Sequence, residues 1–246
     1  MLNQIVSNYE VLVATPPRPD RPAGVSASPK GMIFHVLDDN AAPVEVLDIG
    51  FGVGGLGRMI KANSQTSHWS VDGIDGWAAN CANGPLFARQ IYRNVWHGLA
   101  QELPSERIAS YKIICLLDVI EHLNADTAKW LLRTLLTNLG EQSYLFVSTP
   151  LWFYPQHHAQ DGDLEEHLIG VPASSMMALE PRMYSVANPL IGGFVFDKSS
   201  LELIELFQPT ADKTFTFQRG LRVSRAVNMN CQPGVVFKTA AYAGAS

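Results

Sequence analysis

The sequence has few cysteines, no long apolar run and no excess of positive charge. Its three cysteines, Cys81, Cys115 and Cys231, are far apart and form no CxxC pair. This argues against a disulfide framework or a cysteine zinc site and favours a reducing cytoplasm. No apolar run approaches the ~20 residues of a membrane helix, and no basic segment precedes an apolar core at the N-terminus, so we expect no membrane span and no signal peptide. The formal net charge of -5 argues against binding nucleic acid by charge alone.

Short apolar runs alternate with segments of helical periodicity between residues 44 and 148. This alternation predicts a parallel sheet with helices on both faces. The expected strands in this region are 44–49, 69–75, 92–97, 111–117 and 144–148. The expected helices of the chain are 31–37, 56–62, 78–89, 125–139 and 199–207. Ligands of such sheets bind beyond the carboxyl ends of the strands, so the loops that follow these strands should share one edge.

The flanking segments have different patterns. Residues 1–40 are expected to form an N-terminal extension with a Pro-rich loop at 15–24, and residues 41–246 one domain. Within that domain the stretch 151–195 holds three histidines, four prolines and several aromatics without clear periodicity, which predicts an insertion or lid on the acceptor side. Two further strands are expected at 213–218 and 234–239, and a frayed tail after them. Residues 208–246 carry five basic side chains and one acidic, a pattern typical of a charged sheet edge and compatible with a phosphate, nucleic acid or membrane surface.

A glycine-rich loop follows the first strand, in the run Val46-Leu-Asp-Ile-Gly-Phe-Gly-Val-Gly-Gly55. Gly50, Gly52 and Gly55 satisfy GxGxxG, so a dinucleotide site and a dehydrogenase must be weighed. Asp48, two residues before the first glycine, would repel a pyrophosphate but attract an ammonium group, and S-adenosylmethionine has an ammonium, a sulfonium and no phosphate. Asp75 ends the second strand, where a carboxylate can accept both ribose hydroxyls of either cofactor.

These motifs resemble those of the class I S-adenosylmethionine-dependent methyltransferases. The run from Asp48 to Gly54 is similar to their first motif, and Asp75 to their ribose-binding acid. Leu117-Asp-Val-Ile-Glu-His-Leu123 is similar to the stretch after their fourth strand, and Ser148-Thr-Pro150 to that after their fifth. The resemblance covers about residues 40–150 and, more loosely, 196–240. It implies an α/β, Rossmann-like, doubly wound and mostly parallel sheet of seven strands, with an insertion after the fifth strand and S-adenosyl-L-methionine as cofactor.

The resemblance also assigns the cofactor site. The expected cofactor-binding residues are Asp48, Gly50, Phe51, Gly52, Gly54, Asp75, Gly76, Trp77, Leu99 and Asp118. Leu99 stands where family members often carry an acid for the adenine amino group, so adenine binding would fall to backbone near Leu99, to Gln101 or to Glu102. Trp77 is placed to cover the adenine face. The competing interpretation is an ordinary core or surface tryptophan. Asp118 follows the fourth strand and either faces the cofactor or caps a helix.

Three histidines are the candidates for catalysis. Methyl transfer to a hydroxyl needs a base near neutral pH, most simply histidine, whereas an ionised or soft acceptor needs none. His122 lies at the predicted cofactor edge, and His157 and His167 lie in the insertion; a packed structural histidine and a surface His157-His158 pair are the competing interpretations. The same insertion could hold a divalent metal through His157, His158, Asp161, Asp163, Glu165, Glu166 and His167, but it has no fixed ligand motif, and we expect a solvated acidic loop and no metal.

The sequence therefore predicts a cytoplasmic enzyme that transfers a methyl group from S-adenosylmethionine to a small-molecule acceptor, with a hydroxyl as the leading hypothesis. The alternatives are a macromolecular acceptor and a protein that binds the cofactor without catalysis. Base-methylating families often carry (N/D)PP(Y/F) after the fourth strand, whereas Leu117-Asp-Val-Ile120 stands here, which argues against that chemistry. The acceptor and the oligomeric state are not encoded in any motif.

Overall fold

The structure is a computed structural model that describes residues 9–14, 28–153, 155–158, 161, 163–188, 191–209, 215–217 and 235–239. Its strands are β1 (Tyr9–Ala14), β2 (Glu45–Ile49), β3 (Ser70–Asp75), β4 (Asn94–His97), β5 (Ile113–Leu117), β6 (Tyr144–Pro150), β7 (Met183–Asn188), β8 (Ile191–Phe196), β9 (Phe207–Pro209), β10 (Phe215–Phe217) and β11 (Val235–Thr239). Its α-helices are α2 (Gly55–Ala62), α3 (Ala78–Cys81), α4 (Gly84–Ala88), α5 (Ser105–Ala109), α6 (Ala125–Asn138), α7 (Ala173–Ala178) and α8 (Leu201–Ile204). The 3-10 helices are η1 (Lys30–His35), η2 (Ala100–Glu102), η3 (Ile120–His122) and η4 (Lys198–Ser200).

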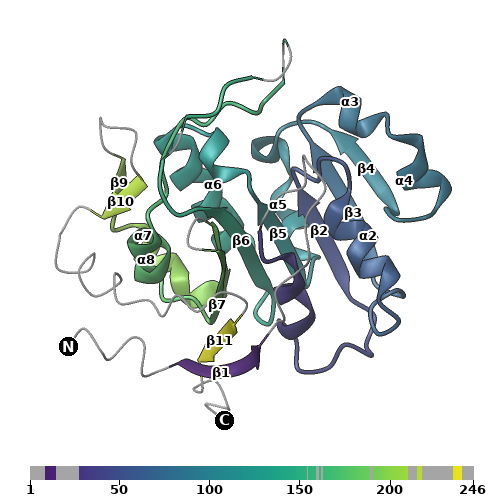
Figure 1. Ribbon diagram of the computed structural model, residues 1–246, viewed down its shortest axis with the longest axis horizontal. Helices are drawn as coiled ribbons and strands as arrows, with labels where there is room; N and C mark the ends of the chain where they lie inside the picture. Colours follow the sequence, from purple (N-terminus) through teal and green to yellow (C-terminus); the bar gives the residue numbers. More distant parts are fainter. Residues whose placement is uncertain are drawn as a thin grey trace.

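The central feature is a nine-stranded sheet in the order β1-β11-β7-β8-β6-β5-β2-β3-β4, which crosses the molecule in Figure 1. The five strands from β6 to β4 are mutually parallel, and β2 lies at the centre of this parallel part. The predicted α/β, mostly parallel, doubly wound fold is confirmed, and all five strands of the glycine-loop half were placed correctly. The carboxyl ends of these strands meet at one edge, as expected.

Two predictions about the sheet are wrong. The sheet has nine strands rather than seven, because it gains β1, β7 and β8, whereas the strand expected at 213–218 is β10 of a separate two-stranded sheet with β9. β1, from the expected N-terminal extension, pairs antiparallel with β11 at the far edge. The stretch 151–195 is irregular only in its first part, since α7, β7 and β8 lie between Ala173 and Phe196. β8 pairs with β6 and β7 with β8. Hydrophobic periodicity did not indicate these two strands, because the apolar pattern is interrupted by Gly192 and Gly193 in β8 and flanked by prolines at 181 and 189.

One helix prediction was also too simple. The expected helix 78–89 is two short helices, α3 and α4, separated by Ala82 and Asn83. Pro85 lies in the first turn of α4, where its missing N–H costs nothing, but it cannot extend a helix that starts at Ala78.

The predicted linker 15–24, the tail and three arginines of the basic segment lie outside the described residues. No described helix is long and apolar enough to cross a membrane. Cys81 and Cys115 are free thiols.

Two hydrophobic cores lie on the two faces of the sheet. Alternate residues of each buried strand enter different cores, so that Leu47 and Ile114 pack with α6 whereas Val46 and Ile113 pack with α2 and η1. The α6 core is a row of leucines at helical spacing, as the sequence predicts. On the other face η1 contributes Met32 and Ile33, so the described part of the N-terminal extension belongs to the core.

Tyr92 fits into a hollow made by glycines on the α2 face. A methyl group added at Gly57 would lie 2.7–2.8 Å from the Tyr92 ring and hydroxyl, and one added at Gly73 would lie 3.1 Å from the same ring. Tyr92 also packs against Phe51, with ring centroids 5.1 Å apart. The small residues of α2 and β3 therefore make room for one aromatic side chain directly below the glycine loop.

This packing predicts that Gly57→Ala destabilises the protein, although alanine in a helix normally stabilises by about 1 kcal/mol relative to glycine. The added methyl group must displace Tyr92, and overpacking of this kind costs about 1–3 kcal/mol. The free energy of unfolding in urea should fall for Gly57→Ala. Gly84→Ala is the matched control, because nothing lies within 4 Å of its added methyl group. Equal stability of Gly57→Ala and the wild type would contradict the close fit of Tyr92.

Candidate active site

The glycine loop turns sharply at the end of β2. Gly50, Gly52 and Gly54 all have positive φ angles, of 68°, 55° and 79°, which glycine adopts without a steric cost. A methyl group at Gly50 would lie 2.5 Å from Val119, so the loop passes close to the segment after β5. At Gly52 nothing lies within 4 Å, and this glycine faces open space at the edge of the sheet. Phe51 points the other way and is buried against Tyr92, so its side chain supports the loop from below.

Asp48 lies beneath this loop and is 2% exposed. The Tyr92 hydroxyl donates a hydrogen bond to its Oδ2 at 2.7 Å. Burial raises the pKa of the Asp48 carboxyl to about 7, although the hydrogen bond from Tyr92 and the charge of Lys30 lower it. Asp48 therefore changes its charge near neutral pH, and a cation beside it would favour the ionised form.

Asp75 connects the glycine loop to the end of β3. Its Oδ2 accepts hydrogen bonds from the backbone amide of Gly52 at 2.8 Å and from the Asn80 side chain at 3.1 Å. Its Oδ1 accepts one from the amide of Trp77 at 2.8 Å. The Asp75 carboxylate is thus held at the same edge as the open side of Gly52, with lone pairs remaining for further donors.

The next loop, after β4, approaches Asp75 from the side. The Glu102 carboxylate accepts a hydrogen bond from the backbone amide of Leu99 at 2.8 Å, so Glu102 turns back onto its own helix. Leu99 is 44% exposed, and its side chain lies 3.0 Å from where a methyl group at Gly76 would be. Trp77 is half-buried beside them. These residues share one surface, and their roles in adenine binding stay predictions.

Asp118 begins the opposite side of the site, after β5. Its φ angle of 57° is unusual for a residue other than glycine, and such strain is common at functional sites. Ser148, in β6, holds it through two hydrogen bonds, from the hydroxyl to Oδ1 at 2.8 Å and from the Asp118 amide to the Ser148 carbonyl at 2.9 Å. These hydrogen bonds fix Asp118 at the end of β5, beside Val119, whose side chain approaches Gly50 of the glycine loop.

Lys30 is a site residue that no sequence motif indicates. It comes from η1, and its Nζ lies 3.6 Å from Oδ2 of Asp118 while it donates to the Ser28 hydroxyl at 2.6 Å. Its charge also lowers the pKa of Asp48. The N-terminal segment thus places one ammonium group among the acidic residues of the edge. Only the fold brings it there, because Lys30 is distant in sequence from every motif.

The irregular segment 151–172 folds back on itself above this edge. The backbone amide of His167 donates to the carbonyl of Gln156 at 3.1 Å, and a methyl group at Gly170 would lie 2.6 Å from the backbone nitrogen of Phe153. In Figure 1 the two arms of this segment run side by side above the carboxyl ends of the parallel strands, the edge at which α3 follows β3. Leu164, near the tip, lies 2.5 Å from the methyl position at Gly76. The segment therefore reaches across to the Asp75 side of the site.

The structure brings two of the three candidate histidines together. The rings of His122 and His167 have centroids 4.9 Å apart, and both lie next to Glu121 in η3. Glu121 is 2% exposed, and the motif after β5 contains it without giving it a role. Burial, followed by the charge of Asp118, raises its pKa well above the usual range. His157 is exposed on the ascending arm of the segment, apart from this cluster.

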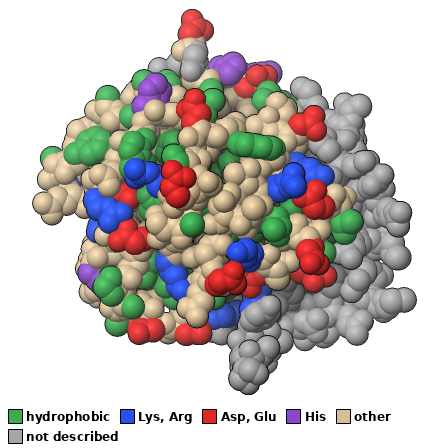
Figure 2. Space-filling view, turned by 180° about the vertical axis from the view of Figure 1, so that it is seen from behind, with side chains coloured by type: hydrophobic (Ala, Val, Ile, Leu, Met, Phe, Trp, Pro, Cys, Tyr) green, Lys and Arg blue, Asp and Glu red, His purple; other side chains and the backbone are tan. Residues whose placement is uncertain are grey.

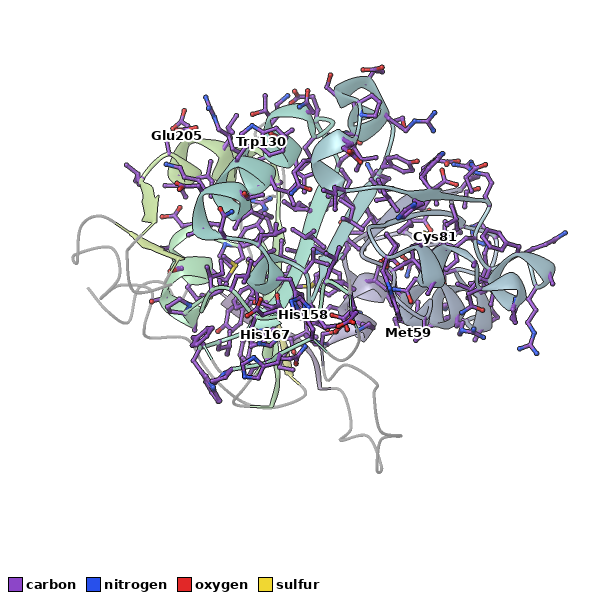
Figure 3. The ribbon with its side chains drawn as sticks, turned by 90° about the horizontal axis from the view of Figure 1, so that it is seen from above. Met59, Cys81, Trp130, His158, His167 and Glu205 are labelled. Atoms are coloured by element: carbon purple, nitrogen blue, oxygen red, sulfur yellow. The ribbon has the colours of Figure 1, made fainter. Side chains whose placement is uncertain are left out.

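The expected acidic loop is organised around His158 rather than solvated throughout. Its Nδ1 lies 2.9 Å from the buried Asp163 carboxylate and its Nε2 lies 3.4 Å from Glu166. The hydrogen bond to Asp163 raises the pKa of His158. In Figure 3, His158 and His167 both lie on the opposite side of the view from Trp130 and Glu205. Among the described residues, the group of possible metal ligands is instead Glu121, His122 and His167.

The side chains of the edge fit an amino-acid nucleoside better than a dinucleotide. Asp48, Asp75 and Asp118 put three carboxylates at the carboxyl ends of β2, β3 and β5, where a pyrophosphate would be repelled. This edge offers carboxylates in Asp48, Asp75 and Asp118 and one ammonium group in Lys30, which match the ammonium, ribose hydroxyl and carboxylate groups of an amino-acid nucleoside. This combination of three carboxylates and one ammonium group therefore suits S-adenosylmethionine.

Comparison with known proteins agrees with this chemistry. The methyltransferase domain family matches residues 22–203. No curated protein matches the chain. One similar solved structure is the N-terminal domain of EvdMO1 with S-adenosylhomocysteine bound, at 11% identity and a TM-score of 0.48, over 68% of this chain and 77% of that one.

Two further solved structures are similar over about half of each chain. The YcgJ protein from Bacillus subtilis is 18% identical with a TM-score of 0.41, over 52% of this chain and 51% of that one. A S-adenosylmethionine-dependent methyltransferase from Clostridium acetobutylicum is 12% identical with a TM-score of 0.42, over 53% of this chain and 55% of that one. This chain therefore spans about half the length of these two proteins.

The family match includes β2 to β8, with the glycine loop, Asp48, Asp75 and Asp118 at the carboxyl edge. It decides against the dehydrogenase that the GxGxxG pattern left open, and it confirms the resemblance that the motifs indicate. The chain belongs to the methyltransferase domain family.

Proposed function

We propose that this domain transfers the methyl group of S-adenosylmethionine to a hydroxyl group of a small-molecule acceptor. The observation that carries the proposal is the position of His122 and His167. Their rings pack together beside Glu121, directly after the strand whose end bears Asp118. A hydroxyl acceptor must lose a proton, and these side chains supply groups that can assist its removal next to the cofactor site.

The residues that would hold the cofactor are those of the carboxyl edge. Asp75 would accept hydrogen bonds from the ribose hydroxyls, and Asp48 and Asp118 would face the ammonium group, with Lys30 near the carboxylate. When bound, the cofactor supplies a methyl group on a positively charged sulfur, which an oxygen lone pair can displace. The chain itself contributes mainly the positioning of the two reactants and a path for the proton.

The segment 151–172 would complete the acceptor side. Its backbone is fixed to η3, and Leu164 lies over Gly76 and Leu99 at the far side of the site. An acceptor placed between this segment and the glycine loop would be screened from water, which favours a small molecule over an extended polymer. On the face seen in Figure 2 the described basic and acidic side chains are interspersed, with no continuous basic patch for nucleic acid among them.

A protein that binds the cofactor without catalysis is the second candidate from the sequence. It shares the cofactor site and differs in what the histidine cluster does. Glu121 and His167 are only 2% and 6% exposed. Burying ionisable side chains costs free energy that apolar residues of the same size would not cost, and this favours a chemical role for the cluster.

The cofactor assignment predicts micromolar binding of S-adenosylhomocysteine in calorimetric titration, and no binding of NAD. Asp75→Ala should weaken the binding of S-adenosylhomocysteine by about 10–100-fold, because hydrogen bonds to a charged group contribute about 1.5–3 kcal/mol. Asp126→Ala, which removes an exposed carboxylate from the first turn of α6, is the control and should bind as the wild type does. Stronger binding of NAD than of S-adenosylhomocysteine would contradict the assignment.

Asp48 predicts a pH dependence of the same binding. Its pKa in the folded protein, about 7, is raised above the unfolded value of 3.8, so the neutral carboxyl group predominates below about pH 7 and the carboxylate above it. Because the ammonium group of the ligand pairs with the carboxylate, the affinity should be about tenfold lower at pH 6 than at pH 8. Asp48→Asn should bind weakly with no such rise over this range. A pH-independent affinity in the wild type would show that Asp48 does not face the ligand.

The acceptor proposal is tested by turnover with a panel of phenols, aliphatic alcohols, amines and thiols, with S-adenosylhomocysteine release as the measurement. We expect O-methylated products, and we expect His167→Ala to lower kcat by about 10²–10⁴-fold with little change in S-adenosylhomocysteine affinity. His68→Ala, an exposed histidine far from the site, should retain full activity. Methylation of amines or thiols alone would refute the hydroxyl acceptor, and cofactor binding without turnover of any acceptor would support the non-catalytic alternative.

A further inference from the structure

We propose that Glu121, His122 and His167 form a binding site for a divalent metal ion at the acceptor side of the cofactor edge. One ligating atom of each of these residues lies within 4.8 Å of the others. Ligands at about 2.1 Å from a common ion are separated by at most about 4.2 Å, so a small contraction would bring all three onto one ion. This cluster differs from the acidic loop that the sequence indicated, and it draws on two distant parts of the chain.

The Glu121 carboxylate gives independent support for a bound cation. Glu121 is 2% exposed, and its Oε2 has no hydrogen-bond partner. A buried carboxylate oxygen without a partner costs about 1–3 kcal/mol or more, and such groups are rare in native structures. Lys30, the ammonium group at this edge, pairs with Asp118. A metal ion held jointly with two imidazoles would satisfy this oxygen.

His122 is oriented as metal-binding histidines usually are. Its Nδ1 lies 3.1 Å from the carbonyl oxygen of Glu166. Since a carbonyl can only accept, Nδ1 carries the proton, and the neutral ring has its lone pair on Nε2. Histidine ligands of metals characteristically donate their second N–H to a carbonyl or carboxylate in this way, which fixes the tautomer and the ring orientation.

The backbone holds the two parts of the cluster in register. The amides of Leu168 and Ile169 both donate to the carbonyl of Glu121, at 2.8 Å and 3.2 Å. Together with the bond from His122 to Glu166, these contacts fix the residues around His167 against η3. The ligands are therefore positioned before any ion binds, which is the arrangement expected of a functional site rather than of a chance contact.

The ligand set indicates the kind of ion. Two imidazoles and one carboxylate suit Mn²⁺, Fe²⁺, Co²⁺ or Zn²⁺, whereas Mg²⁺ and Ca²⁺ prefer oxygen ligands throughout. Three protein ligands leave coordination positions for exogenous oxygen atoms, as in catalytic metal sites. Metal binding at this site does not depend on the proposed function, whereas a catalytic role for the ion rests on it. An acceptor hydroxyl bound to the ion would have a lowered pKa. Its proton would pass to solvent, its oxygen would bond to the methyl carbon, and the carbon–sulfur bond would break with its electron pair left on sulfur.

The test is metal binding by the full chain after removal of bound ions with a chelator. Titration with Mn²⁺, followed by the loss of the free-ion electron paramagnetic resonance signal, should give one site per chain. Glu121→Gln and His167→Ala should each weaken this binding at least tenfold. Glu121→Gln replaces the buried carboxylate with a neutral group of the same shape, so it should remain folded, and circular dichroism with S-adenosylhomocysteine binding verifies this.

Two control variants separate this site from surface histidines and from the neighbouring acidic loop. His68→Ala removes an exposed imidazole elsewhere and should bind Mn²⁺ as the wild type does. His158→Ala disrupts the acidic loop with Asp163 and Glu166, and it should reduce the affinity less than Glu121→Gln does. The proposal is overturned if the wild type binds no stoichiometric Mn²⁺, Co²⁺ or Zn²⁺, or if only His158→Ala abolishes binding. Methyl transfer to a hydroxyl by a metal-free enzyme would leave the proposed function standing and remove the ion from it.

Discussion

The hydrogen bond from Tyr92 to Asp48 connects the packing of the fold to the chemistry of its edge. Tyr92 fills the space left by Gly57 and Gly73, supports Phe51 of the glycine loop, and holds a carboxylate that burial would otherwise leave neutral. The conformation of the loop and the charge beneath it therefore depend on one side chain. For this reason a buried acid and a run of small residues occur together at this point of the sequence.

The second half of the site is assembled by backbone contacts between segments that are distant in sequence. Residues 166–169 bond to η3 through Glu121 and His122, and Ser148 holds Asp118 from the neighbouring strand. The acceptor side thus uses short irregular segments attached to the rigid strands β5 and β6. Its precision comes from the sheet beneath it, which is buried on both faces, and not from regular structure within the segment itself.

The sequence was sufficient for the parallel half of the fold, and the roles it assigns to the cofactor-binding residues stay predictions. Strand, glycine turn and acid follow one another locally, so the pattern and the family resemblance together placed Asp48, Gly52 and Asp75 at one edge of the sheet, where the structure has them. Lys30 and Glu121 could not, because their importance comes from neighbours that only the fold supplies. The strands β7 and β8 were missed because glycines and prolines interrupt their apolar pattern, and β1 because its pairing partner lies more than two hundred residues away. Long-range pairing leaves no local periodicity.

The pairing of β1 with β11 has a consequence for the order in which the protein is made. Tyr9 lies opposite Thr239 and Ala14 opposite Val235, so among the described strands the first in sequence pairs with the last. Until β11 has been synthesised, β1 lacks its partner and the edge of β7 that β11 covers is unpaired. The cofactor half can form earlier, because every strand it needs is complete by Pro150. Folding of the nascent chain should therefore begin at the glycine loop and end at the edge where the two terminal strands meet.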